Sequence, residues 1–185
     1  MDLTSVSPDP AGLKALAHPL RLRMLGMLRI DGPATATGLA ERLGVNTGVT
    51  SYHLRQLAQH GFIVEDVDQG NGRERWWRAA HESTRTKGDG GDAEAMSAYI
   101  HAIAAFYAEQ QQRALIEYPF LPEEWSRATT LSDWVIRLTP ARAQALRDYL
   151  GAEIHAQEEV PEGTEGSAHF VVQLSTYPLP GEVVP

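Results

Sequence analysis

Apolar residues recur at helical spacing near the beginning of the chain. They include Leu13, Leu16, Leu20, Leu25 and Leu28. This spacing places the side chains on one face of a helix. Pro19 interrupts the pattern, and a proline is tolerated in the first turn of a helix but not in its interior. The pattern therefore predicts a loose tail of about ten residues, a helix at about 11–17 and a second helix from Pro19 to about Leu28.

The next segment predicts two more short helices joined by a tight turn. Thr35 or Thr37 can cap the first of them, because a threonine side chain accepts a hydrogen bond from a free helix amide. Gly44 can end it, because glycine readily adopts the left-handed conformation. Residues 45–46 form the connection, and a second helix begins at Thr47. Two short helices in this order are typical of a helix-turn-helix motif.

A β-hairpin is predicted directly after the second helix. The segment FIVEDV is strand-like, QGNG is a tight turn, and RERWWRAA returns as a second strand. Near the tip lie two cations, Arg73 and Arg75. Such a basic hairpin after a helix-turn-helix predicts a winged domain over residues 11–87.

One face of the second helix of the motif is polar and free of acidic residues. On a helical wheel the arc expected to face the core contains Val49, Thr50, His53, Leu54 and Leu57. The opposite arc contains Gly48, Ser51, Tyr52, Arg55 and Gln59. Its hydroxyl, amide and guanidinium groups can donate to base edges and phosphates in a DNA major groove. Asn46 and Thr47 lie at the N-terminal end, where helix amides favour a phosphate.

The hairpin adds a second expected DNA contact. A basic tip that carries Arg73 and Arg75 suits a minor groove or flanking phosphates. Trp76 and Trp77 are expected to pack against the domain rather than to stack on bases. For Tyr52, the pattern leaves open both a contact to DNA and packing at the edge of the helix.

Three segments between Leu13 and His81 carry a family resemblance: LKALAHPLRLRMLGML, ATATGLAERLGVNTGVTSYHLRQLAQHGFIVE and GRERWWRAA. In this order they resemble the ArsR-like winged-helix repressors. The segment VTSYHLRQL is similar to the family's Val-Ser-x-His-Leu-x-x-Leu recognition helix, with Thr50 in place of serine. The resemblance implies a transcriptional repressor that binds a palindromic operator as a homodimer. It places DNA contacts at Thr47, Gly48, Ser51, Tyr52, Arg55, Arg73 and Arg75. The matching histidine, His53, faces the core on the wheel and is expected to be structural.

The second half of the chain follows a polar, glycine-rich linker at 83–92. Apolar residues at helical spacing predict a long helix over 93–117. Alternating residues predict strands around Trp134–Leu138 and Phe170–Leu174. Between them, Thr139 can cap a helix that continues to about Ala156, because Pro140 suits the first helical position.

These elements define the expected fold, which is α+β and mainly α. A winged helix-turn-helix domain is followed by a long dimerisation helix and a small β-α-β part. The long helix has more apolar residues than one thin domain can bury, so we expect it to form the main dimer contact. Residues 92–185 would form a C-terminal domain for dimerisation and ligand sensing. The segment LTPARAQALRDYL gives this half a resemblance to the C-terminal region of the helix-turn-helix domain 20 subgroup.

Charge is divided unevenly along the chain. Residues 1–87 hold eleven Lys and Arg against nine Asp and Glu, whereas residues 88–185 hold five against fifteen. The asymmetry fits a division of labour between a DNA-binding half and an acidic half. It fits equally well with an acidic half that is merely well solvated.

Other functional classes find little support in the residues. The chain has no cysteine, and His101 has no histidine partner three or four residues away, so we expect neither a metal site nor a cofactor. The phosphate-binding and nucleophile motifs of common enzymes are missing, so we expect no catalysis. No secretory signal or membrane-length apolar run is found, which predicts a cytoplasmic protein.

Two questions stay open at this point. The aromatic residues Phe120, Trp125 and Trp134, with Tyr107, could line an apolar cavity for a small organic effector, or they could be plain core. The winged helix could bind DNA, or it could be an interaction module for another regulator. The acid-free helix face and the arginines of the hairpin favour DNA.

Overall fold

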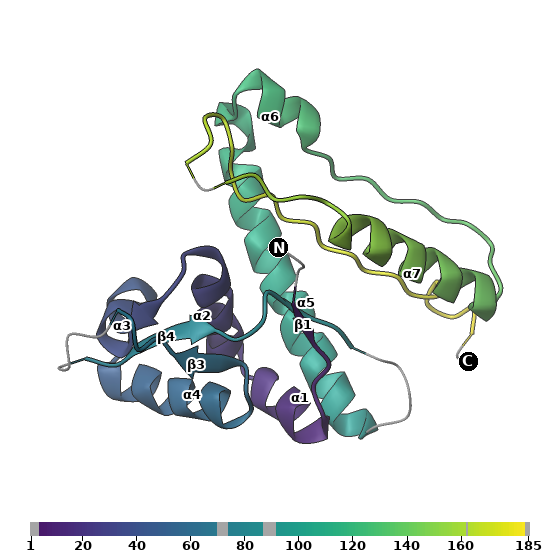
Figure 1. The fold of residues 1–185 in the computed structure, drawn as a ribbon. Helices are drawn as coiled ribbons and strands as arrows, with labels where there is room; N and C mark the ends of the chain where they lie inside the picture. The colour runs from purple at the N-terminus through teal and green to yellow at the C-terminus, as the bar shows by residue number, and fades with distance from the viewer. Residues whose placement is uncertain (1–3, 70–73, 87–91, 162, 184–185) are drawn as a thin grey trace. The chain divides into compact units, whose positions relative to one another are not determined.

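The computed structural model describes residues 4–69, 74–86, 92–161 and 163–183. The chain divides into an N-terminal unit that ends at Glu117 and a C-terminal unit that begins at Tyr118. Figure 1 shows the elements of both. The long helix α5, which follows the linker at 83–92, belongs to the N-terminal unit because it packs against α1 and α2.

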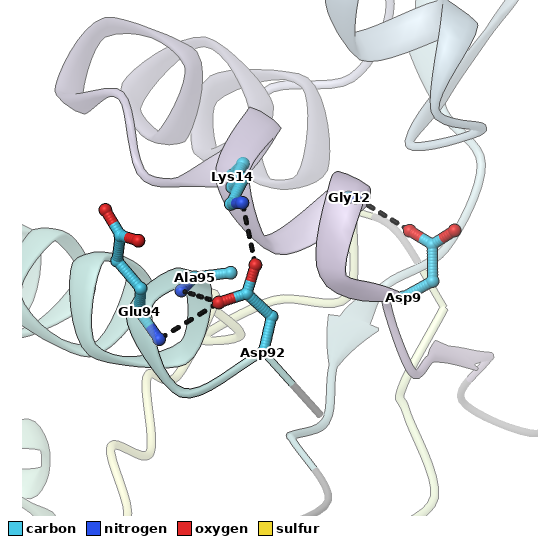
Figure 2. Close-up of polar contacts among 6 residues, drawn as sticks. All are labelled: Asp9, Gly12, Lys14, Asp92, Glu94 and Ala95. Atoms are coloured by element: carbon cyan, nitrogen blue, oxygen red, sulfur yellow. Dashed lines mark hydrogen bonds and ion pairs between the residues drawn. The ribbon is translucent and has the colours of Figure 1, made fainter. Parts of the chain in front are cut away.

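Five helices build the N-terminal unit, close to the predicted bounds. They are α1 (Pro10–Leu16), α2 (Pro19–Ile30), α3 (Ala36–Leu43), α4 (Thr47–Gln59) and α5 (Ala93–Glu117). Asp9 caps α1 by accepting a 2.7 Å hydrogen bond from the Gly12 amide (Figure 2). Thr35, one of the two predicted caps, accepts from the amide of Gly38 at 3.1 Å. Gly44 ends α3 with a φ of 64°, as its left-handed preference predicts.

A small three-stranded sheet follows the helix-turn-helix. Strands β3 (Ile63–Glu65) and β4 (Trp76–Ala79) pair antiparallel and form the predicted hairpin. The other edge of β4 pairs with β2 (Ala34–Thr35), which gives the order β2-β4-β3. The pattern did not predict β2, because a strand of two residues shows no alternation. The sheet ties the hairpin to the segment that precedes α3.

The N-terminal residues are part of the fold, so the expectation of a loose tail was wrong from residue 5 onward. Strand β1 (Ser5–Val6) pairs parallel with β5 (Ser83–Thr84). The amide of Arg85 also donates to the carbonyl oxygen of Val6 at 2.9 Å. Backbone hydrogen bonds of this kind depend on the tertiary fold and leave no mark on the side-chain pattern.

The core of the N-terminal unit lies where its helices meet the sheet. Its fully buried members include Leu16, Met24, Leu25, Leu39, Leu54, Leu57, Phe62 and Ile63. From α5 the side chains of Ala95 and Tyr99 are buried in the same core. Figure 1 shows α1 beside one end of α5. The first half of α5 is therefore a structural part of the winged domain.

The C-terminal unit contains three short or medium helices. They are the 3-10 helix η1 (Tyr118–Phe120), α6 (Glu123–Ala128) and α7 (Pro140–His155). Thr139 caps α7 and Pro140 occupies its first turn, as predicted. The strands predicted around Trp134–Leu138 and Phe170–Leu174 are not found among the described residues of this unit. Alternation favours an extended backbone, but a strand also needs a hydrogen-bonded partner, and neither segment has one here.

The aromatic side chains of this unit do not enclose the cavity that the pattern suggested. Phe120 is 84% exposed and Trp134 is 79% exposed. Trp125 stacks on Phe170 instead, with ring centroids 6.2 Å apart and an interplanar angle of 25°. Within the described part of the chain, no helix is both long enough and apolar enough to span a bilayer.

Candidate nucleic-acid interface

The N-terminal end of α4 is fixed by its own capping residue. Oδ1 of Asn46 accepts a hydrogen bond from the Gly48 amide at 2.7 Å, so the side chain satisfies one free amide of the first turn. Asn46, Thr47 and Gly48 are all exposed. The carbonyl oxygen of Asn46 also accepts from the amides of Val49 and Thr50. The positive end of the helix dipole is nevertheless exposed at this turn and suits an anion such as a backbone phosphate.

The polar arc of α4 is exposed as the wheel predicted. Tyr52 is 53% exposed, Arg55 and Gln59 are also exposed, and Ser51 is half-buried. Val49 corrects the expectation, because it is 40% exposed rather than buried. It lies at the edge of the apolar arc, about 100° from Thr50, so the core does not cover it.

Arg55 lies along its own helix. Its Nε donates to the carbonyl oxygen of Ser51 at 3.1 Å, while the side chain remains exposed. The amino groups of the guanidinium carry the donors that a bidentate contact to a guanine would use. From Gly44 to Val64 the sequence has no acidic residue. The carboxylate at the end of the neighbouring strand β3, that of Glu65, is paired with Arg75.

A buried threonine joins the two helices of the motif. Thr50 is fully buried, and its hydroxyl oxygen lies 2.8 Å from the carbonyl oxygen of Ala36 in α3. The same oxygen lies 3.0 Å from the carbonyl oxygen of Thr47. The hydroxyl proton is shared between a contact inside α4 and a contact to α3, which fixes the relative position of the two helices.

Beneath the exposed face, two histidines and an arginine hold α4 against α2. His53 is buried, as predicted, and its ring centroid lies 4.4 Å from that of His18. Its Nδ1 lies 3.4 Å from Nη1 of Arg21. His18 also caps α2, because its Nδ1 accepts from the amide of Leu20 at 3.2 Å. These contacts make His53 a positioning residue rather than a DNA contact.

The environment of these two histidines disfavours their protonation. Burial lowers the pKa of His18 below its ordinary value, and the charge of Arg21 adds to that effect. Burial likewise lowers the pKa of His53, helped by His18 and then by Arg21. Both rings are therefore neutral near pH 7. The pattern pointed to His53 but missed the roles of His18 and Arg21, although a histidine directly before the proline that opens a helix is a capping signal.

Of the two cations predicted at the hairpin, Arg75 lies among the described residues. Arg75 is exposed, and its Nε lies 3.1 Å from a carboxylate oxygen of Glu65 on the neighbouring strand. Its guanidinium carbon lies 5.5 Å from the ring centroid of Trp77. Trp77 is buried and Trp76 is half-buried, which agrees with their predicted packing role. Arg73 lies outside the described residues.

Two polar features of the hairpin were not predicted. Thr37 at the start of α3 donates to a carboxylate oxygen of Glu74 at 3.3 Å, which joins the helix-turn-helix to the hairpin. Arg78 on β4 is exposed and adds a further cation to the same strand as Trp77. The order RERWWR contains the signal for Arg78, because the residue directly after the buried Trp77 points to the opposite face of the strand.

The sequence of the winged domain is similar to known helix-turn-helix proteins. Residues 16–66 match the helix-turn-helix domain family HTH_20. The HTH-type transcriptional regulator NmtR of Mycobacterium tuberculosis is 38% identical over 66 residues. The N-terminal unit thus resembles an ArsR-like winged helix-turn-helix domain. The family match lies within this winged domain and not over the C-terminal segment that suggested the domain 20 resemblance.

The matched region is limited in length. The 66 aligned residues are 36% of this chain and 54% of NmtR, so the chain spans about half the length of this curated relative. A solved structure of a possible transcriptional regulator for arsenical resistance is 22% identical and covers 57% of this chain and 93% of its own, with a TM-score of 0.33. Lactococcus lactis ZitR is 14% identical, with coverages of 75% and 81% and a TM-score of 0.34.

The polar side chains of the winged domain are mostly hydrogen-bond donors. Among the described residues, no group of three or more His, Asp or Glu side chains is arranged to hold a metal ion. Apart from Val49, the side chains that are exposed along α4 and β4 carry hydroxyl, amide or guanidinium groups. Such a surface can bind an anionic polymer through phosphates and base edges.

Proposed function

We propose that the chain is a sequence-specific DNA-binding transcriptional repressor that acts as a homodimer on a palindromic operator. In this proposal α4 enters the major groove and the hairpin contacts the flanking backbone. The residues proposed to touch DNA are Asn46, Thr47, Gly48, Ser51, Tyr52, Arg55, Gln59, Arg73 and Arg75.

The acid-free exposed face of α4 carries this proposal. The chain as a whole has a net charge of −8, yet the exposed side chains of α4 include Arg55 and no carboxylate. A solvated helix face in such an acidic chain would ordinarily contain glutamates. A helix face without carboxylates suits a DNA groove, because phosphates repel carboxylates.

Exposed apolar side chains on α5 support the homodimer. Ile100 and Leu115 are 51% and 44% exposed and lie within about 60° of each other around the helix, although the first half of the helix also packs into the core. Apolar groups of this size on a surface are typical of an interface. A second copy that covers them would fix the distance between two α4 helices, which must match half-sites about 34 Å apart.

The C-terminal unit also exposes apolar side chains that a second copy of the chain could cover. Val135, Val171 and Val172 are all exposed. Among the described residues of this unit, none is buried. We propose that this unit contributes to the dimer together with α5. The acidic residues concentrated there would keep it away from the phosphates of the operator.

A salt-dependent gel shift tests the proposal. The full chain is titrated onto the DNA upstream of its own gene and onto a scrambled duplex of the same length. We expect a shift of the upstream DNA that weakens as salt increases and exceeds the shift of the scrambled duplex. Arg142→Ala serves as a control, because Arg142 is an exposed arginine of α7 and lies outside the proposed interface.

The alternative function would give a different result. A winged helix that serves as an interaction module for another regulator would bind neither duplex, at low salt or at physiological salt. Equal binding to both duplexes would support DNA binding but contradict sequence specificity.

A further inference from the structure

A small cavity lies inside the N-terminal unit, away from the exposed face of α4. It has a volume of about 90 Å³ and lies between α2, α5 and the strand β5. Leu25 and Phe106 are among the apolar side chains that line it. Its polar lining consists of Arg29, Thr84, Tyr99 and Tyr107. The cavity therefore combines a hydrocarbon wall with one cation and three hydroxyl groups.

Arg29 is a half-buried cation without a counter-ion in the described part of the chain. Its Nε donates to the carbonyl oxygen of His81 and its Nη2 donates to the hydroxyl of Thr84, both at 2.9 Å. None of the ion pairs among the described residues includes Arg29. Burial lowers its pKa, but a guanidinium remains protonated at neutral pH. Two neutral acceptors hold the group in place and leave its positive charge uncompensated, an unfavourable state that an anion would relieve.

The two tyrosines supply further donors beside this charge. Burial raises the pKa of Tyr99 to about 12, and burial also raises the pKa of Tyr107, so both hydroxyls stay protonated at neutral pH. Arg29 opposes both shifts, as expected for a cation close to both rings. Among the hydrogen bonds between described residues, neither tyrosine hydroxyl takes part. Both are therefore available to donate to a bound group.

We propose that this cavity binds a short-chain aliphatic carboxylate. The guanidinium of Arg29 matches the two oxygens of a carboxylate, and the tyrosine hydroxyls can donate to the same oxygens. The apolar wall suits a short hydrocarbon chain and disfavours a fully hydrated inorganic anion. An apolar cavity of about 150 Å³ holds a benzene ring, so a volume of about 90 Å³ restricts the ligand to a chain of roughly two to four carbons.

The position of the cavity links it to the helix-turn-helix. Helix α2 contributes Arg29 to the cavity and contacts α4, where its Arg21 lies against His53. A ligand held between α2 and α5 therefore acts on the helix that supports α4. Binding of the carboxylate does not depend on the proposed function, whereas an effect of the ligand on DNA affinity does rest on it.

Calorimetric titration of the full chain tests binding directly. Sodium acetate, propionate and butyrate are titrated at constant sodium concentration, with butyramide and inorganic phosphate as comparators. We expect one saturable site per chain for propionate or butyrate, and at least roughly tenfold weaker binding of butyramide, which lacks the charge. Equal affinity for butyramide would overturn the role of Arg29, and tighter binding of phosphate would overturn the carboxylate assignment.

Three variants locate the site. Arg29→Gln should weaken butyrate binding roughly tenfold or more, because it removes the charged donor. Tyr107→Phe should weaken butyrate binding about threefold, the effect of one neutral hydrogen bond. If Arg29→Gln fails to fold, the affinity of Tyr107→Phe for butyrate decides whether the cavity is the site. Arg23→Gln is the matched control, because Arg23 lies on the same helix but pairs with Glu109 on the surface. Wild-type affinity in both cavity variants would overturn the site.

Two further measurements complete the test. Amide NMR resonances of Gly26 and Thr84 should shift on addition of butyrate, because Gly26 also lines the cavity; shifts confined to other residues would overturn the location. Operator affinity is then measured with and without saturating butyrate. Loss of all DNA binding would contradict the proposed function and leave the calorimetric result standing, so the two failures can be distinguished.

Discussion

The ammonium nitrogen of Lys14 lies 2.7 Å from Oδ2 of Asp92 and joins α1 to the beginning of α5 (Figure 2). The other carboxylate oxygen of Asp92 accepts from the amides of Glu94 and Ala95, each at 3.1 Å. One side chain therefore both caps the long helix and attaches it to the first helix. The hydrogen bond from Lys14 is the main cause that lowers the pKa of Asp92, followed by the bond from the Ala95 amide.

A lowered carboxyl pKa predicts how this contact responds to acid. The contact stabilises the fold above the ordinary Asp pKa of about 3.9, and the stabilisation is lost as the pH falls through the lower pKa of the folded state. Asp92→Asn keeps an oxygen that can cap α5 but removes the charge. We expect it to melt at a lower temperature than wild type at pH 6, with a difference that shrinks toward pH 3. Lys14→Met should behave in the same way, and a difference that is as large at pH 3 as at pH 6 would contradict the assignment.

The paired histidines predict a second loss of stability on acidification, which begins at a higher pH than the loss caused by Asp92. Because burial lowers the pKa of His18 and His53 in the folded state, the unfolded chain takes up protons first as the pH falls. Stability should therefore decrease from about pH 6.5 downward. His18→Asn keeps a capping side chain for α2 and removes one titrating ring, so its melting temperature should fall less steeply between pH 6.5 and pH 5. Identical slopes in the two proteins would show that His18 does not titrate in this range.

The exposed residues of α4 predict a loss of sequence-specific affinity. Arg55→Ala and Tyr52→Ala should each weaken binding to the operator while the protein stays folded. A bidentate contact from arginine to guanine contributes about 1–3 kcal/mol, so we expect that range for Arg55. Fluorescence anisotropy with operator and scrambled duplexes measures the effect. Operator binding as tight as that of wild type in both variants would place the recognition surface elsewhere.

The ion pair between Arg75 and Glu65 predicts that substitutions of its two members change DNA affinity in opposite directions. Arg75→Ala should lower affinity for operator and scrambled DNA alike and reduce the salt slope by about 0.9, the value for one phosphate contact. Arg73→Ala should act in the same way. Glu65→Gln should instead strengthen binding, because it releases the guanidinium of Arg75 and removes a nearby negative charge. A salt slope that is unchanged in all three variants would show that the hairpin stays off the DNA.

The exposed apolar side chains on one side of α5 predict the oligomeric state. Sedimentation velocity at micromolar concentration should show a dimer for wild type and a monomer for the double variant Ile100→Asp and Leu115→Asp, because a buried carboxylate is costly in an apolar interface. Val67→Asp provides the matched control, since Val67 is an exposed apolar side chain of the hairpin. A wild-type protein that sediments as a monomer would contradict the dimer.

The sequence pattern predicted those elements whose signal is local. The bounds of α5, the caps at Thr35 and Thr139 and the exposed arc of α4 follow from helical spacing and capping chemistry, which act over a few residues. The strands β1, β2 and β5 were missed because two residues show no period. The strands predicted in the C-terminal unit were wrong because alternation cannot supply a pairing partner.

The cavity beside Arg29 shows the limit of the pattern most clearly. Arg29 follows Leu25 by four residues and Leu22 by seven, so the sequence places a cation on the apolar stripe of α2. That observation hints at a buried charge. Only the fold shows that Tyr99 and Tyr107, some seventy residues later, face the same space.

The hydrogen bond from Thr50 to the carbonyl oxygen of Ala36 bears on the heat of DNA binding. Because α4 is already ordered and fixed to α3, docking would require no coil-to-helix transition in the reading element. The heat-capacity change of association should then reflect the surface removed from water at the contact, without the large additional decrease that accompanies coupled folding. An entropic penalty for ordering would fall instead on side chains such as Arg55, which must leave its own helix to reach a base.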